Sequence, residues 1–117
     1  MVAHIVLLAP RADLTADQRD GIVAALERAA RDIPSVRRVR IGRRLRHGAA
    51  YEQLATPDFP FAAIFEFDDL AGLREYLAHP AHADLGARFY DSLSAALACD
   101  YELDGVAGAR GWFDARM

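Results

Sequence analysis

The segment FEFDDLAGLREYLAHPAH, residues 65–82, contains the end of a strand, a short helix and the start of another helix. Phenylalanine alternates with Glu66 as in a half-buried strand, and one of the two aspartates that follow can cap the helix. Pro80 disfavours helical geometry at His79, so the short helix is expected to end there and a new one to begin at once. This order sets the expected architecture of the second half of the chain.

The first half of the chain reads as strand, helix, strand. In VAHIVLL, residues 2–8, both the odd and the even positions are apolar, apart from His4. Because alternate residues of a strand point to opposite faces, this pattern indicates a central strand covered on both faces. Thr15 and Gln18 have the spacing of a capping box, and a helical repeat of apolar residues follows them. Pro34 is expected to stop this helix.

An arginine-rich stretch, SVRRVRIGRRLRHG, forms the expected second strand, with six arginines within residues 37–46. Val39 and Ile41 lie on one face, and Arg38 and Arg40 on the other. A nucleic-acid patch is one interpretation, but no aromatic residues are interleaved for base stacking. The pattern favours a solvated strand edge with ion pairs between subunits, which also discourages unwanted edge pairing.

The remaining elements follow from periodicity and from glycine and proline positions. The expected elements are a connection over residues 47–60 with one helical turn or a lid, a third strand over 61–69, a helix over 81–97, and a fourth strand over 98–104. The tail, residues 105–117, contains Trp112 and Phe113 and is expected to be irregular, as a segment that docks on a neighbour. Whether these two side chains cover the pocket or the dimer stays open on the sequence alone.

The order strand–helix–strand, repeated twice, predicts an α+β fold. It is the ferredoxin-like βαββαβ arrangement, or split βαβ, with four antiparallel strands and the helices on one face. The other face of the sheet then lacks cover, although both parities of the first strand are apolar. Two protomers packed sheet to sheet, as a dimeric α/β barrel, resolve this conflict. Residues 1–104 are expected to form the domain, and 105–117 a tail.

Composition excludes several classes of function. The chain of 117 residues has a net charge of −3, which gives no general attraction to nucleic acid. No apolar run is long enough to span a membrane, and the start does not resemble a signal peptide. The single Cys99 cannot form an internal disulfide, which fits a reducing cytoplasm. All fourteen basic residues are arginine. That suggests a GC-rich bacterial genome and excludes Schiff-base lysine chemistry.

Three segments, VAHIVLL, IPSVRRVRIG and FEFDDLAGLREYLAHPAH, resemble the stress-responsive dimeric α/β-barrel (Dabb) family over roughly residues 2–104. The resemblance implies a homodimer with a ferredoxin-like protomer, but it does not fix a reaction. The family includes olivetolic acid cyclase-like proteins, which close a linear polyketide by aldol condensation without a metal or cofactor.

That branch implies a catalytic pair, which falls here on His82 and Tyr76. The pocket-lining residues are predicted to be His4, Val6, Leu8, Ile22, Val23, Leu26, Phe61, Ala63, Phe65, His79, Leu85, Gly86 and Leu93. Leu26 stands where the branch has a pocket tyrosine, and Phe61 where it has a pocket histidine. These departures imply a different substrate. No metal is expected, because the spacing of His79 and His82 spans a helix break.

The residues themselves suit proton abstraction next to a carbonyl. His82, in the first turn of a helix, is expected to stay neutral and act as a base. Tyr76 can donate to an enolate oxygen, and His4 can orient one of the two. Structural roles remain open for each: His79 bonded to helix carbonyls, His82 fixing the joint, and Tyr76 and His4 as satisfied core residues.

Three functions remain open on the sequence alone. The first is a cofactor-independent cyclase, isomerase or lyase acting on an enolisable, polyketide-like carbonyl compound. The second is a non-catalytic stress-responsive or small-ligand-binding dimer, and the third a cofactor-free monooxygenase of related dimeric-barrel families. The expected partners are a second copy and a small apolar or aromatic ligand, without nucleic acid or membrane. A deep cavity with His82 and Tyr76 facing one another would favour catalysis.

Overall fold

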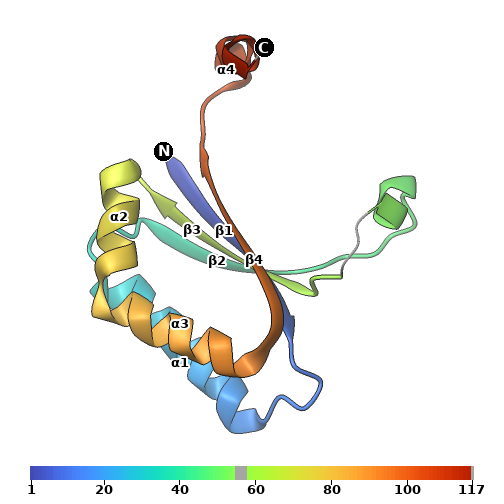
Figure 1. The fold of residues 1–117 in the computed structure, drawn as a ribbon, viewed down its shortest axis with the longest axis vertical. Helices are drawn as coiled ribbons and strands as arrows, with labels where there is room; N and C mark the ends of the chain where they lie inside the picture. Colours follow the sequence, from blue (N-terminus) through green and yellow to red (C-terminus); the bar gives the residue numbers. More distant parts are fainter. Residues whose placement is uncertain (55–57, 117) are drawn as a thin grey trace.

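The computed structural model describes residues 1–54 and 58–116 and has three helices on one face of a four-stranded sheet (Figure 1). The elements are β1 (Val2–Pro10), α1 (Ala16–Asp32), β2 (Arg38–Arg43), η1 (Ala50–Leu54), β3 (Phe61–Phe67), α2 (Leu70–Ala78), α3 (Pro80–Ser92), β4 (Leu93–Glu102), η2 (Val106–Gly108) and α4 (Ala109–Arg116). None of the helices in the described part of the chain is long and apolar enough to cross a bilayer.

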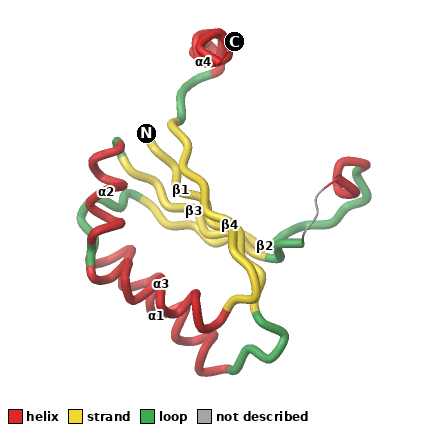
Figure 2. Tube along the Cα trace, viewed as in Figure 1, coloured by secondary structure: helices red, strands yellow, loops and turns green. Residues whose placement is uncertain are grey.

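The strands lie in the order β2-β3-β1-β4, and each adjacent pair is antiparallel (Figure 2). This is the ferredoxin-like topology, so the fold predicted from the order of elements is confirmed. The register places His4 of β1 between Phe65 of β3 and Asp100 of β4. These three side chains therefore leave the sheet on the same face, towards the helices.

The core lies between the sheet and the helices α1, α2 and α3. Alternate residues of β3, from Ala63 to Phe67, are fully buried on this face, as the alternating pattern predicts. Ala25 and Ala29 form the buried surface of α1, where small side chains let the helix come close to its neighbours. Leu73 and Leu85 complete the core from α2 and α3. The opposite face of the sheet, here called the outer face, carries no helix (Figure 1).

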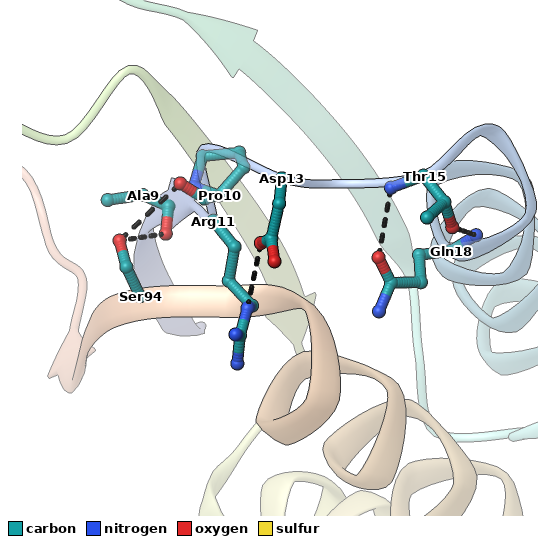
Figure 3. Close-up of polar contacts among 7 residues, drawn as sticks. All are labelled: Ala9, Pro10, Arg11, Asp13, Thr15, Gln18 and Ser94. Atoms are coloured by element: carbon teal, nitrogen blue, oxygen red, sulfur yellow. Dashed lines mark hydrogen bonds and ion pairs between the residues drawn. The ribbon is translucent and has the colours of Figure 1, made fainter.

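The connection from β1 to α1 is held by short polar contacts (Figure 3). The Ser94 hydroxyl donates to the Ala9 carbonyl at 3.0 Å, which ties the end of β1 to the start of β4. The Gln18 N–H donates to the Thr15 hydroxyl at 3.1 Å, and the Thr15 N–H donates to the Gln18 side chain at 2.9 Å. The predicted capping box is therefore confirmed.

His79 joins α2 to α3 through its backbone and its ring. Its N–H donates to the Tyr76 carbonyl at 3.1 Å and ends α2. Its ring Nδ1 accepts from the Ala81 N–H at 3.0 Å and caps α3, with Pro80 in the first turn. The expectation that this ring bonds to helix carbonyls was wrong, because an imidazole nitrogen can serve as an N-cap acceptor.

The helix expected over residues 81–97 ends at Ser92, and β4 begins at Leu93, earlier than the fourth strand expected over residues 98–104. Alanine and leucine favour a helix in isolation, but here they pair with β1, as with Leu97 opposite Leu7. The Ser92 carbonyl accepts the Arg11 N–H at 3.0 Å, which fixes the corner between α3 and β4. Long-range pairing therefore overrides local propensity.

The tail also differs from the expectation, because η2 and α4 replace an irregular segment. The Leu103 N–H donates to the Met1 carbonyl at 2.8 Å, and beyond this bond the chain leaves the sheet. Figure 1 shows α4 standing apart from the layers of the fold.

Several arginines of and around β2 form ion pairs with acidic residues of their own chain. Arg38 on this edge strand forms a bidentate pair with Glu66 of β3, with a shortest contact of 2.6 Å. Arg37 pairs with Asp68 at 2.6 Å. The sheet register supplies these acidic partners from β3 and the segment that follows it. Ion pairs between subunits stay a prediction.

Candidate active site

Four polar side chains from four elements meet at one end of the core. This group, the polar cluster, consists of His4 from β1, Tyr76 from α2, His82 from α3 and Asp100 from β4. The Tyr76 ring lies between the two histidines, with ring centroids 5.5 Å from His4 and 4.7 Å from His82. The joint at His79 turns the chain back, so residues six apart in sequence meet.

Tyr76 is only 1% exposed to solvent. Its ring packs against the rings of Phe65 and Phe67, at centroid distances of 5.1 and 5.2 Å. This burial raises the pKa of the Tyr76 hydroxyl far above its usual value, and the charge of Asp100 raises it further. Tyr76 is therefore a neutral phenol and a hydrogen-bond donor throughout the physiological range.

His82 is partly buried, and this burial lowers the pKa of its imidazole below the ordinary value for histidine. The nearby His4 lowers the pKa further, whereas the Leu77 carbonyl acts in the opposite direction. The ring is thus neutral near pH 7, with a lone pair free to accept a proton. The sequence predicted this direction from the helix N-terminus, whereas the causes in the structure are burial first and the neighbouring His4 second.

His4 and Asp100 form the shortest contact of the polar cluster, with Nδ1 of the ring 2.6 Å from Oδ1 of the carboxylate. A carboxylate can only accept, so Nδ1 of His4 donates this hydrogen bond. The Asp100 side chain is about half exposed, so the polar cluster opens to solvent on that side. Asp100 was missed because its place opposite His4 follows only from the strand register.

A separate cavity, the α1 hollow, has a volume of about 500 Å³. It lies between α1 and the end of the sheet that carries Leu8, Ile41 and Phe61. It is lined by Leu8, Pro10, Leu14, Arg19, Ile22, Val23, Leu26, Glu27, Ala30, Val39, Ile41, Phe61 and Leu93. Six predicted pocket residues are in this lining: Leu8, Ile22, Val23, Leu26, Phe61 and Leu93. The cavity is nearly all apolar, and Arg19 and Glu27 supply its charges.

The structure does not bring the other predicted residues to this lining. Val6 and Ala63 are paired across β1 and β3 and are buried between the α1 hollow and the polar cluster. His4, Phe65, Tyr76 and Leu85 are also buried in the core, His79 forms the helix joint, and Gly86 is exposed on α3. The predicted residues therefore divide between an apolar cavity and a polar cluster.

Over the described residues, no three histidine, cysteine, aspartate or glutamate side chains lie close enough together to hold a metal ion. The hydrogen-bond partner of His4 is a carboxylate, and the ring of His79 is engaged with the backbone of α3. The histidine, tyrosine and aspartate side chains of the polar cluster are groups that can transfer protons.

A family model described as the stress responsive A/B barrel domain (Dabb) matches residues 2–103. The chain belongs to this family. The Dabb match covers all four strands and ends before η2 and α4. No curated protein sequence matches the chain.

Several solved structures share this fold. A dimeric ferredoxin-like protein from Thermobifida fusca is 27% identical, with a TM-score of 0.67, and the match covers 87% of this chain and 90% of that one. A Dabb family protein from Mesorhizobium loti is 20% identical, with a TM-score of 0.68 over 89% and 97%. A hydroxynitrile lyase from Passiflora edulis is 18% identical, with a TM-score of 0.75 over 90% and 94%.

Proposed function

We propose that this Dabb chain is a homodimeric acid–base enzyme that acts on an enolisable carbonyl compound. His82 removes a proton next to the carbonyl, and the Tyr76 hydroxyl donates to the enolate oxygen that forms. The bond-forming or bond-breaking step that follows is of the cyclase, isomerase or lyase type. No metal or organic cofactor enters this chemistry.

The main support for the proposal is that two neutral rings, the imidazole of His82 and the phenol of Tyr76, lie side by side. His82 is a neutral base because burial lowers its pKa, and Tyr76 is a neutral donor because burial raises its pKa. The two rings are neighbours, with centroids 4.7 Å apart and planes tilted by 60°. Two groups with pKa values moved apart in this way suit proton transfer in both directions.

His4 and Asp100 act as positioning residues in this proposal. Their hydrogen bond of 2.6 Å keeps a proton on Nδ1 of His4 and fixes the place of its ring beside Tyr76. The negative charge of Asp100 also favours the protonated form of Tyr76. The donor therefore keeps its proton until an oxyanion develops next to it.

Support for a homodimer comes from the outer face. Ile5, Leu7, Ile64 and Leu97 lie on this face of the sheet, which no helix of the chain covers (Figure 1). The Thermobifida fusca protein, described as dimeric and ferredoxin-like, is the precedent for a second copy on this face. A sheet-to-sheet dimer would remove these side chains from water.

A non-catalytic ligand-binding dimer is the second candidate, and the α1 hollow favours it. A cavity of about 500 Å³ is of the size that holds a small organic ligand. Val6 and Ala63 are buried between this cavity and the polar cluster. A ligand held there would not touch His82 without movement of the core.

The test is the exchange of α-protons of aromatic and acyclic methyl ketones in D2O, followed by NMR. The wild-type chain is expected to catalyse exchange, and His82→Gln to reduce the rate by about 10²-fold to 10⁴-fold. Tyr76→Phe is expected to reduce it by roughly 10²-fold to 10³-fold. His47→Gln is the matched control, since His47 is exposed in the connection after β2 and should leave the rate unchanged.

Equal rates for wild type and both cluster variants would contradict the enzymatic proposal. Binding of an apolar ketone without exchange, lost in Leu26→Arg but kept in His82→Gln, would establish the ligand-binding dimer in its place.

A further inference from the structure

Two segments of the chain project from the sheet on the side of its outer face. The loop arm, residues 44–54, follows β2 and contains η1, and the tail arm, residues 103–116, follows β4 and contains α4. Figure 1 and Figure 2 show both arms on the side opposite α1, α2 and α3, with the outer face between them. A second copy on this face would lie between the two arms.

Both arms carry large apolar side chains into solvent. In the loop arm, Leu54 is 84% exposed, and Leu45 and Tyr51 are also exposed. In the tail arm, Val106 is 93% exposed and Phe113 is exposed as well. Side chains of this size gathered on projecting segments mark an interaction surface.

The loop arm is ordered from within. Oε1 of Glu52 accepts the N–H groups of His47, Gly48 and Ala49 at 2.8, 2.7 and 3.0 Å. Gly48 has φ +91°, in the left-handed region that glycine adopts without cost, and this turn lets the three N–H groups converge. The arm is therefore pre-formed for contact with a partner.

The tail arm, by contrast, has too little packing in its own chain to explain its helix. α4 has eight residues and packs against η2. An isolated helix of this length is marginal in water, so its stability must come from contacts with another surface. Trp112 and Phe113 are the side chains that such a surface would cover.

A matching surface exists at the base of the loop arm. This outer hollow has a volume of about 590 Å³ and is lined by Leu7 and Leu97 of the sheet and by Leu45, Tyr51 and Leu54 of the loop arm. Leu7 and Leu97 belong to the outer face, so the hollow is continuous with the surface that the proposed homodimer buries.

The two arms lie at opposite ends of the sheet. The tail arm leaves the end of the sheet where the backbones of Met1 and Leu103 are hydrogen-bonded. The loop arm leaves the opposite end, where Leu7, Leu97 and Phe61 lie. A two-fold axis that lies between two stacked sheets and crosses their strands brings opposite ends together. The tail arm of one copy then meets the loop arm of the other.

We propose that the tail arm is exchanged between the two copies of the homodimer. α4 of each copy packs against the loop arm and the outer hollow of the other, with Trp112 and Phe113 as the buried side chains. The inference rests on the proposed homodimer but adds a contact to it. The Dabb match ends at residue 103, so this contact belongs to a segment outside the family domain.

Trp112 is the only tryptophan of the chain, so its fluorescence reports on α4 alone. The experiment uses the full-length chain, with the monomer and dimer ranges defined by analytical ultracentrifugation. Trp112 should emit at shorter wavelength and resist acrylamide quenching in the dimer, and both properties should be lost on dilution to the monomer. Trp112→Ala should weaken the dimer about thirtyfold or more, the effect of losing a buried interface tryptophan.

A matched pair of variants locates the contact. Leu54→Glu, in the loop arm, should expose Trp112 to quencher at a concentration where the wild type is dimeric. Tyr90→Glu should not, because Tyr90 is similarly exposed, at 88%, but lies on α3. Both replaced side chains are in solvent in the protomer, so both variants should fold.

The outcomes separate this inference from the homodimer itself. A dimer in which Trp112 stays quenchable and Leu54→Glu has no effect would overturn the arm exchange and leave the homodimer standing. Protection of Trp112 in the monomer would also overturn it, since α4 would then dock on its own chain. A chain that is monomeric at every concentration would overturn both.

Discussion

The chemistry proposed for this Dabb chain depends on the protonation of two side chains, Tyr76 and His82. Both are held neutral by burial, which raises the pKa of the phenol and lowers that of the imidazole. A charged group at either place would be costly in the core. The same packing that stabilises the fold therefore prepares a donor and a base.

The pH dependence of stability should reveal the lowered pKa of His82. As the pH falls below about 6.5, the unfolded chain takes up a proton that the folded chain resists, so the free energy of unfolding should decrease. His82→Gln should remove this component, so that wild type loses more stability than the variant between pH 7.5 and pH 5. Urea unfolding measures both. Equal losses would contradict the lowered pKa.

Replacement of Asp100 tests the positioning role of the His4–Asp100 pair. Asp100→Asn should lower kcat for ketone α-proton exchange roughly tenfold to a hundredfold, because a charge-assisted hydrogen bond to His4 is lost. KM should change little, since Asp100 does not touch the substrate in this account. A change confined to KM would contradict the assignment. Glu102→Gln, on the same strand two residues away, is the control.

The sequence predicted some of the individual residues of the candidate site. The resemblance to the Dabb family pointed to Tyr76 and His82, and the structure places their rings in contact. Whether they are catalytic stays a prediction. Asp100 could not be found, because a carboxylate on an alternating strand carries no signal until its register with His4 is known.

The helices and strands show where local patterns are sufficient. Thr15 and Asp69 cap α1 and α2 as their positions predict, because capping depends on residues within one turn. The boundary between α3 and β4 was misplaced, because leucine and alanine between residues 93 and 97 suit a helix. Their pairing with β1 is a long-range contact that no local window contains.

Two helix glycines give a matched pair of stability predictions. Gly86→Ala in α3 should stabilise the chain by about 1 kcal/mol, because the added Cβ meets nothing within 4 Å. Gly21→Ala in α1 should gain less, because its Cβ would lie 3.0 Å from Nη1 of Arg88, which must shift. Thermal or urea unfolding of both variants measures the difference. A larger gain at Gly21 would contradict the described packing of α1 on α3.

Over the whole molecule, the sequence predicted the layers of the fold. β1 carries apolar side chains on both faces of the sheet. In the structure the helices cover one of these faces and leave the other uncovered. The tail was harder, because its glycines weaken any helical pattern and its helix has little packing in its own chain. The separation of the α1 hollow from the polar cluster also depends on packing that the sequence does not show.

A charge on the outer face should separate the two protomers. Leu97→Arg should shift the chain from dimer to monomer in analytical ultracentrifugation, because it would bury an unpaired charge between stacked sheets. Leu70→Arg is the matched control, since Leu70 and Leu97 are equally exposed, at 49%, and Leu70 lies at the start of α2. If both variants remain dimeric, the interface lies elsewhere.

The most direct test of the acid–base site is an NMR titration of the histidine rings. The His82 signal is assigned by its loss in His82→Gln, and the titration is repeated with an aromatic methyl ketone. His82 is expected to titrate below the ordinary histidine value of about 6.5, and the ketone is expected to shift its resonance. An ordinary pKa for His82, together with indifference to the ketone, would contradict the proposed base.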